Sequence, residues 1–343
     1  RGTLPVAAVL ANSGQLRLTP VRLLQAGCVD SLAPMPTMQS LTADDLRAVI
    51  AGYAKALVAH RETINRLNVY PVPDGDTGTN MALTLSSVVD ELRSCDRDLS
   101  ATCEALAHGS LMGARGNSGV ILSQILRAVA GVFREAGVID GRTLADALDA
   151  ASTAAYGAVM RPVEGTILTV MRVAAEGARV AADAGAELDG VLDAARAGGA
   201  DALARTPEML PVLAEAGVVD AGGAGLLLLF DVALHLVDGR PLPEPEADPV
   251  GASPEFLRAF DAAHGEGGHT GLAGLRYEVM FFLDAADDSI PGFKDVWATL
   301  GDSIVVVGGD GLWNCHIHTD DIGASVEAGI DVGKPRGIRV TDL

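Results

Sequence analysis

Residues Asn68 to Met81 read N-V-Y-P-V-P-D-G-D-T-G-T-N-M, and an apolar helical pattern begins only at the last of them. Asp74 and Asp76 flank Gly75 on a turn, so their two carboxylates can serve one site. Mg²⁺ is commonly held by one or two carboxylates, with water and substrate phosphates as its remaining ligands. The stretch therefore predicts a magnesium-nucleotide site. The alternative is a plain turn whose polar side chains only cap the next helix.

The composition limits what else the chain can be. Its 343 residues carry 25 basic and 45 acidic side chains, a net charge of -20, and 49% of the residues are hydrophobic. This is ample for a sizeable core, and the length suggests two domains. A basic patch is missing from the sequence, so nucleic acid is not an expected partner. An acidic protein that handles phosphates needs metal ions, which agrees with the magnesium site.

The sequence also bears on the cellular compartment. Its four cysteines are scattered without a C-x-x-C pair, which argues against a disulfide framework and a Cys₄ zinc site and favours a reducing cytoplasm. The longest apolar run, Ala224 to Leu236, is too short to span a bilayer. The run Leu4 to Leu10 lacks the basic flank of a signal peptide. We expect a cytoplasmic protein without an integral membrane segment.

Helical patterns dominate the first two thirds of the chain. Residues 1–40 show little periodicity and are expected to be a poorly ordered extension. Thr42 and Asp45 then have capping-box spacing. Eight helical patterns follow, without strand-like alternation between them: Thr42–Leu67, Met81–Leu92, Ala101–Met112, Ser118–Ala136, Thr143–Val159, Thr166–Ala184, Leu188–Ala204 and Gly223–Val237. We predict an all-α bundle over residues 41–238.

The pattern changes after a proline-rich linker at residues 239–255. In residues 256–343 strand and helix patterns alternate in the order βαββαβ, which predicts a small α+β domain of the split βαβ, or ferredoxin-like, type. The expected elements are strands at Arg276–Leu283, Ser303–Val307, Leu312–His318 and Gly337–Thr341, and helices at Gly292–Leu300 and Ala324–Val332.

Four polar, glycine-rich loops recur in the helical part. They are the D-G-D loop, R-G-N-S-G at Arg115–Gly119, P-V-E-G-T at Pro162–Thr166 and V-D-A-G-G at Val219–Gly223. They precede the second, fourth, sixth and eighth helices, and in an up-and-down bundle such loops gather at one end. Backbone amides at a helix N-terminus favour a phosphate. Capping alone does not explain why only alternate helices have this loop, so the pattern favours one shared phosphate and metal site.

These motifs resemble the ATP-binding subunit of bacterial fatty acid kinase. Two of the loops match that family over longer stretches, which read G-A-R-G-N-S-G-V-I-L-S-Q and R-P-V-E-G-T-I-L-T-V. The amino-terminal domain of that subunit belongs to the dihydroxyacetone kinase L-subunit family. The resemblance covers about residues 42–343 in order, which makes it specific. It implies an eight-helix barrel that binds ATP and Mg²⁺ at one mouth, followed by a middle domain.

The resemblance also implies roles for particular residues. The magnesium ligands would be Asn68, Asp74 and Asp76, with Asn68 standing where relatives mostly have Asp, and the two aspartates would be the catalytic carboxylates. Thr77, Thr79 and Asn80 would contact the phosphates. The remaining nucleotide contacts would come from Gly116, Asn117, Ser118, Arg161, Thr166, Asp220 and Gly222.

The second domain resembles the family's middle domain through L-G-D-S-I-V-V-V-G and C-H-I-H-T-D-D. Relatives have a Cys on the first strand and two His in H-x-H, a plausible zinc set, and here Glu278 stands at the Cys position. His316 and His318 are two apart on a strand and point to one face. A zinc site of Glu278, His316 and His318 is one interpretation. Two structural histidines without a metal are the other.

Two departures from the family pattern affect the functional prediction. Ala221 replaces a Ser usual in V-V-D-S-G-G, so a hydroxyl contact is lost. The sequence stops at Leu343, where relatives continue into a carboxy-terminal domain that helps to engage the fatty-acid-binding partner. The chain is either a fragment or a shorter version, and a homodimer is one expectation for its assembly.

The resemblance thus predicts a kinase that transfers the γ-phosphoryl group of ATP to a fatty acid carboxylate presented by a separate fatty-acid-binding protein. The first alternative is a kinase of a small hydroxylated molecule such as dihydroxyacetone, although the H-x-H domain favours the fatty acid type. The second is a non-catalytic regulator or scaffold that binds nucleotide and a protein partner.

Overall fold

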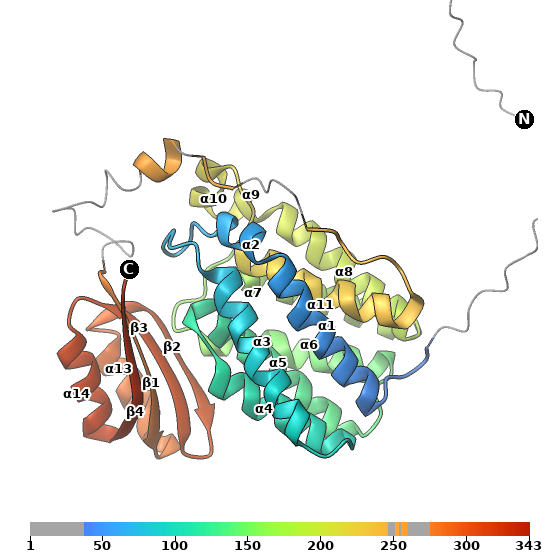
Figure 1. Ribbon diagram of the computed structural model, residues 1–343, viewed down its shortest axis with the longest axis horizontal. Helices are drawn as coiled ribbons and strands as arrows, with labels where there is room; N and C mark the ends of the chain where they lie inside the picture. Colours follow the sequence, from blue (N-terminus) through green and yellow to red (C-terminus); the bar gives the residue numbers. More distant parts are fainter. Residues whose placement is uncertain (1–37, 246–250, 254, 260–274) are drawn as a thin grey trace, which may run out of the picture. The chain divides into compact units, whose positions relative to one another are not determined.

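The computed structural model describes residues 38–245, 251–253, 255–259 and 275–343 (Figure 1). Of the extension expected at residues 1–40, only residues 38–40 are among those described. All of the described residues belong to one compact unit, so the helical and α+β parts are packed together.

The amino-terminal part is helical throughout its regular structure. Its helices are α1 Ala43–Ala59, α2 Arg61–Leu67, α3 Thr77–Ser94, α4 Leu99–Gly113, α5 Gly116–Ala136, α6 Gly141–Ala158, α7 Ile167–Asp183, α8 Leu188–Ala204, α9 Thr206–Met209, α10 Pro211–Ala216 and α11 Ala221–Asp238. All eight predicted helices are present. The first is divided at His60 into α1 and α2, and the two short helices α9 and α10 were not predicted. The capping box is confirmed, because the N–H of Asp45 donates to Oγ1 of Thr42 at 3.2 Å.

The long helices form a closed ring. Each packs against the next in the chain, α8 packs against α11, and α11 and α3 both pack against α1. Small residues set the close spacing: a Cβ on Gly177 of α7 would lie 2.6 Å from the carbonyl oxygen of Ala194 on α8. The predicted bundle is therefore an eight-helix barrel.

Helix α11 is the most apolar element of this barrel. Among the described helices it has the length and composition to cross a membrane, but 67% of it is buried inside the protein. Leu226 and Leu234 are fully buried. Tyr53 of α1 donates a buried hydrogen bond of 3.0 Å to the carbonyl oxygen of Gly225. This is the burial of a core helix.

The linker has two different halves. Residues 241–245 have no regular secondary structure, as the prolines predict. Further on, the N–H of Ala252 donates to the carbonyl oxygen of Arg66 at 3.2 Å, and Ala252 packs against a small apolar cluster that includes Leu213. Ala252 of the linker is thus attached to the helical part.

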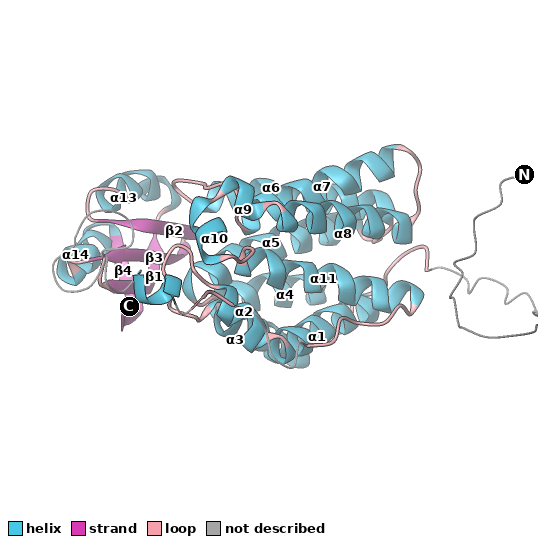
Figure 2. Cartoon of the chain, turned by 90° about the horizontal axis from the view of Figure 1, so that it is seen from above, coloured by secondary structure: helices cyan, strands magenta, loops and turns pink. Residues whose placement is uncertain are grey.

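The carboxy-terminal part contains the strands (Figure 2). Its elements are β1 Tyr277–Ala285, a 3₁₀ turn Asp287–Ser289, α13 Ile290–Trp297, β2 Gly301–Gly309, β3 Leu312–Thr319, α14 Ile322–Val332 and β4 Gly333–Asp342. The strands are in the order β2-β3-β1-β4, and all neighbours are antiparallel. This confirms the predicted ferredoxin-like arrangement.

The two faces of the sheet have different partners, because successive strand residues point to opposite faces. On one face Phe281 packs edge-on against Trp297 of α13, with ring centroids 5.3 Å apart. On the other, Met280 belongs to a buried cluster that includes Leu111 of α4. Asn314 Nδ2 also donates to the carbonyl oxygen of Leu111 at 3.1 Å. The second face is therefore attached to the helical barrel.

Candidate functional site

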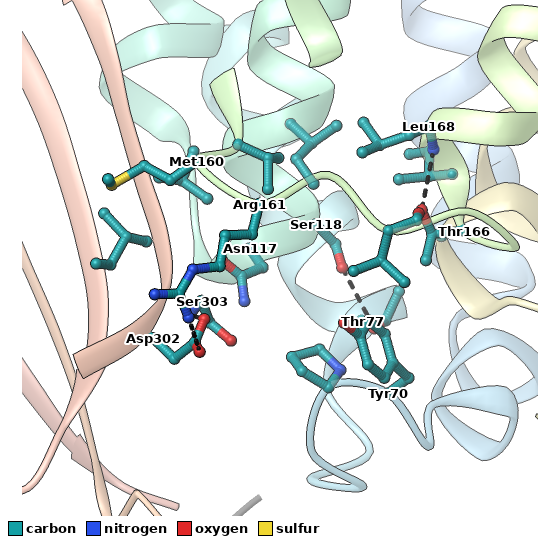
Figure 3. A pocket seen from close by; sticks show the side chains of 18 of the residues that line it. Tyr70, Thr77, Asn117, Ser118, Met160, Arg161, Thr166, Leu168, Asp302 and Ser303 are labelled. Atoms are coloured by element: carbon teal, nitrogen blue, oxygen red, sulfur yellow. Dashed lines mark hydrogen bonds and ion pairs between the residues drawn. The ribbon is translucent and has the colours of Figure 1, made fainter. Parts of the chain in front are cut away.

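The four glycine-rich loops meet at one cavity of about 240 Å³ (Figure 3). Each loop precedes an alternate helix of the barrel, so all four lie at the same end, as the sequence predicted. The predicted nucleotide-contacting residues that line the cavity are Thr77, Asn117, Ser118, Arg161, Thr166, Asp220 and Gly222. Residues from four separate segments are thus brought to one site.

Capping explains two of these loops and not the other two. Asp220 accepts a 2.6 Å hydrogen bond from the N–H of Gly223, and Thr166 accepts from Leu168 at 3.4 Å. Asp76 precedes α3 and Arg115 precedes α5, and neither side chain caps its helix. At α5 the first N–H groups are left for an anion. At α3 the Asp76 carboxylate is left for another partner.

A smaller cleft of about 30 Å³ adjoins the main cavity, and both share Thr77, Asn117 and Ser118 in their linings. Asp74 and Asp76 line this smaller cleft. Asp74 is exposed as a residue, but Asn68 Nδ2 donates to its carboxylate, so the acidic group is turned towards the loop. The cleft therefore places two carboxylates beside the phosphate-binding loops.

The electrostatics of the two carboxylates fit a cation. Partial burial and the like charge of Asp76 raise the pKa of Asp74 to about 7, and burial also raises the pKa of Asp76. Glu278 adds a third negative charge that raises both pKa values further. A bound cation would relieve this repulsion. Two carboxylates are also the usual protein contribution to a Mg²⁺ site.

Asn68 organises the D-G-D loop. The residue is buried, its Oδ1 accepts a 2.7 Å bond from Oγ1 of Thr77, and its Nδ2 donates to the carbonyl oxygen of Val72 at 3.2 Å. An amide oxygen can accept twice, so a metal ligand role for Asn68 stays a prediction. Its neutral side chain is what lets it bond both Thr77 and Asp74.

The R-G-N-S-G loop contributes a buried acceptor and a tight backbone approach. Oδ1 of Asn117 is buried and has no hydrogen-bond partner among the described residues. A buried polar atom left unpaired is costly, so a ligand is expected to satisfy it. Gly116 has a φ of 53°, and a Cβ there would lie 2.3 Å from Nδ2 of Asn80. The loop is therefore closely fitted to the start of α3.

One predicted phosphate contact is engaged elsewhere. The N–H of Thr79 donates to Oδ1 of Asn65 at 3.1 Å, and Nδ2 of Asn65 donates to Oγ1 of Thr79 at 3.0 Å. Thr79 lines neither the cavity nor the adjoining cleft. Its contact with phosphate stays a prediction, whereas its observed role is to hold α2 against α3.

The zinc site is not supported. Among the residues that the structure describes, no three His, Cys, Asp or Glu side chains are grouped so that they could hold a metal. Instead, Nδ1 of the fully buried His316 lies 3.2 Å from Oε1 of Glu278. Burial alone would raise the pKa of Glu278, but His316, Thr341 and His318 together outweigh it and lower the pKa to about 2. In the structure, Glu278 is thus the acidic neighbour of His316.

His318 and Glu278 line the same small cleft as Asp74 and Asp76. Burial lowers the pKa of His318 to about 3, so its ring is neutral at pH 7. The sequence suggested two separate sites in two domains. The structure shows one continuous site to which both domains contribute.

Comparisons with known proteins agree with this architecture. The family model of the DAK2 domain matches residues 71–235, and a second family model, for the middle domain of fatty acid kinase-like proteins, matches residues 274–343. The chain thus combines a DAK2 domain with a middle domain of this kind. The DAK2 match covers the barrel helices α3 to α8 and most of α11, and the middle-domain match covers the whole β-sheet.

Named relatives extend the match over most of the chain. Protein YloV of Bacillus subtilis is 38% identical over 80% of this chain and 50% of its own length. An uncharacterized protein of Staphylococcus haemolyticus is 34% identical over 84% of this chain and 53% of its own. The chain thus spans about half the length of these relatives. The dihydroxyacetone kinase from C. freundii, solved in complex with AMP-PNP and Mg²⁺, matches 64% of this chain and 38% of its own, with 17% identity and a TM-score of 0.42.

The sequence did not predict that residues of the middle domain, or Tyr70, line the cavity of the helical domain. Asp302 and Ser303 of β2 line it, as does Tyr70 of the D-G-D loop. Burial raises the pKa of Tyr70, and the charges of Asp302 and Asp220 raise it further. The motif L-G-D-S-I-V-V-V-G indicated a strand, but nothing in its spacing indicated that this strand reaches the loops of the barrel.

Proposed function

We propose that this protein is an ATP- and Mg²⁺-dependent phosphotransferase whose acceptor is the carboxylate of a fatty acid presented by a separate fatty-acid-binding protein. The observation that carries the proposal is the meeting of four glycine-rich loops at one cavity, with Asp74 and Asp76 in the adjoining cleft. The middle-domain match supports the fatty acid as acceptor. It also supports a protein partner that presents the fatty acid.

The proposal gives each part of the site a task. Asp74 and Asp76, with Asn68 beside them, would hold Mg²⁺, which neutralises phosphate charge when bound. Thr77 and Ser118 share a 3.3 Å hydrogen bond between their hydroxyls at the junction of cavity and cleft. They are positioned to contact phosphate oxygens together with the first amides of α5.

The apolar side chains of the cavity lining suit a nucleobase. Ile121, Val159, Val163 and Leu168 contribute to this lining. Apolar side chains around a few polar groups are typical of a site for a flat organic ligand. The base would thus lie against these side chains, and the phosphates would point towards the carboxylates.

The chemistry of the acceptor agrees with the side chains present. A fatty acid carboxylate is already ionised at pH 7 and needs no general base. Its oxygen would attack the γ-phosphorus, the bond to ADP would break, and an acyl phosphate would form. Positioning and charge neutralisation are then the main tasks of the protein.

Two other functions remain to be distinguished by experiment. The DAK2 match allows a small hydroxylated acceptor such as dihydroxyacetone, which, unlike a carboxylate, has to lose a proton during transfer. A nucleotide-binding regulator would bind MgATP through the same loops and transfer nothing. The three functions would use the same cavity and would differ in the product that is formed.

To test the proposal, the chain is incubated with MgATP and one of three additions. These are a bacterial fatty-acid-binding protein loaded with fatty acid, the same carrier protein without fatty acid, and dihydroxyacetone. ADP release is followed together with hydroxylamine trapping, which converts an acyl phosphate to a hydroxamate. We expect hydroxamate only with the loaded carrier. Dihydroxyacetone phosphate would establish the small-substrate kinase instead, and ATP binding without any product would establish the regulator.

A further inference from the structure

Arg161 is the single cationic side chain among the residues that line the cavity and the adjoining cleft. The acidic side chains lining these two spaces are Asp74, Asp76, Asp220, Glu278 and Asp302. A nucleotide brings further negative charge to such a site. Among these lining side chains, this guanidinium is therefore the one that can neutralise phosphate charge, and its position matters for nucleotide binding.

Arg161 has little support from its own domain. Its side chain is 69% exposed, and the residue directly precedes the P-V-E-G-T loop. A long exposed side chain samples many rotamers, and fixing it costs entropy. Its ion-pair partner is Asp302 of β2, whose Oδ2 lies 3.0 Å from Nη1 of Arg161 and whose side chain is only 22% exposed (Figure 3). The cation is thus held from the middle domain.

Asp302 is itself fixed by the backbone. The N–H of Ser303 donates to its other oxygen, Oδ1, at 2.7 Å. Ser303 has a φ of 52°, and the pairing of β2 with β3 is irregular between Asp302 and Val305. A positive φ is unusual for a residue with a side chain, and a β-bulge re-aims the side chains near it. The bulge directs the Asp302 carboxylate into the cavity.

The same stretch of β2 is tied to the barrel directly beside this ion pair. Val305 forms an isolated antiparallel bridge with Val159, and the N–H of Met160 approaches the carbonyl oxygen of Ile304 at 3.4 Å. These backbone contacts bring the bulge and the P-V-E-G-T loop into register. The ion pair is therefore part of a fixed junction and not an isolated surface contact.

We propose that Asp302 is a positioning residue of the nucleotide site: it holds the Arg161 guanidinium where a nucleotide's phosphates bind, so that the middle domain completes the ATP site of the DAK2 domain. This inference rests on the proposed function and adds to it a role for the middle domain. Arg161 contacts the phosphate, and Asp302 acts through Arg161.

The test is equilibrium binding of MgADP, MgATP and adenosine to the full chain and to Asp302→Asn, measured by calorimetry. We expect the variant to bind both phosphorylated nucleotides about three- to tenfold more weakly, the range for an exposed to partly buried ion pair. Adenosine binding is expected to stay unchanged, because adenosine has no phosphate for Arg161. Asp284→Asn is the matched control, since Asp284 pairs with Arg336 in the same domain and lies outside the cavity.

A double-mutant cycle separates positioning from a general effect. Once Arg161 is replaced in Arg161→Ala, adding Asp302→Asn is expected to weaken MgADP binding no further. Additive losses would overturn the proposal. So would unchanged or tighter nucleotide binding by Asp302→Asn, since tighter binding would mean that the carboxylate mainly repels phosphate.

The outcomes for folding and for the proposed function are kept apart. Circular dichroism and the thermal midpoint of each variant show whether the fold is intact, and the Arg161→Ala background tests Asp302 even if one variant is less stable. If the wild-type chain binds no Mg-nucleotide, the proposed function fails. If it binds but Asp302→Asn and Asp284→Asn behave like wild type, only the positioning role fails.

Discussion

At the scale of single residues, Asp74 and Asp76 are the side chains on which the magnesium proposal depends. Neither of them caps a helix, and partial burial raises the pKa of each. They are therefore unfavourably placed without a cation, which is typical of functional carboxylates and not of structural ones. Their removal should cost function rather than folding.

We expect Asp74→Ala or Asp76→Ala to abolish Mg²⁺-dependent ATP binding, because each variant removes one of two carboxylates. The helical circular dichroism should stay intact, since both residues lie in a loop. Titration of MgATP into each variant is the measurement. Asp90→Asn is the control, because Asp90 forms an exposed pair with Arg93 on the same helix, α3, and lines neither the cavity nor the cleft. Undiminished nucleotide affinity in both alanine variants would refute the site assignment.

Asp220 gives a pH-dependent prediction. Burial raises its pKa to about 6, from 3.8, although its bond from Gly223 opposes the shift. The folded state thus holds a proton that the unfolded state has lost between about pH 4 and 6. The contribution of Asp220 to stability therefore falls as pH rises through this window, by about 3 kcal/mol in all.

In Asp220→Asn the amide oxygen can still accept the bond from Gly223, and no charge is buried. We expect the apoprotein variant to match wild type near pH 4 and to become relatively more stable up to about pH 7. Urea unfolding at several pH values measures this. If the free energies of unfolding of the two proteins changed in parallel with pH, burial would not destabilise the charged form of Asp220.

At the scale of elements, helix α5 shows how glycine positions the site. Gly119 lies in its first turn, where a Cβ would be 2.4 Å from Oγ1 of Thr84 on α3. Gly131 lies near its other end, with nothing within 4 Å of a Cβ. The two glycines share a helix and differ in packing, so they make a matched pair.

We expect Gly119→Ala to lower the free energy of unfolding by about 1–3 kcal/mol through overpacking, and to weaken nucleotide binding because α3 and α5 carry the site. Gly131→Ala should instead stabilise the protein by about 0.5–1 kcal/mol, since alanine is the better helix former. Denaturant unfolding of both variants checks the pair. Equal changes in the free energy of unfolding for the two variants would mean that the close contact between α5 and α3 does not exclude a side chain at Gly119.

At the scale of the whole molecule, the barrel and the sheet share a core. Met280 of β1 is buried in the cluster with Leu111 of α4, and Val305 and Val120 belong to the same cluster. Ile338 of β4, by contrast, is 46% exposed. Because the shared cluster is buried, unfolding either part exposes apolar surface of the other.

We expect the two domains to unfold in one calorimetric transition. Met280→Ala should lower the free energy of unfolding by about 2–5 kcal/mol, the range for removing a large core side chain. Ile338→Ala, on the exposed strand, should change it by no more than about 0.5 kcal/mol. Two separate transitions in the wild-type protein would show that the shared cluster does not couple the domains.

The sequence by itself determined the elements and the residues of the loops. Helical periodicity, glycine-rich entries to alternate helices and the βαββαβ pattern depend on short-range order, so the helical bundle, the ferredoxin-like sheet and the convergence of Asp74, Asn117, Thr166 and Asp220 could be predicted, whereas the closed barrel was implied by the family resemblance. The division at His60 and the short helices α9 and α10 could not, because tertiary packing decides them.

Only the tertiary structure decided how the two domains share the site. It placed Glu278 beside Asp74 and Asp76, paired it with His316 in place of a zinc set, and brought Asp302 to Arg161. These pairs are separated by dozens to about 200 residues, and they form because one face of the sheet buries Met280 and Val305 against the barrel. Local sequence patterns carry no information about which surface covers another, whereas the burial of those surfaces fixes it.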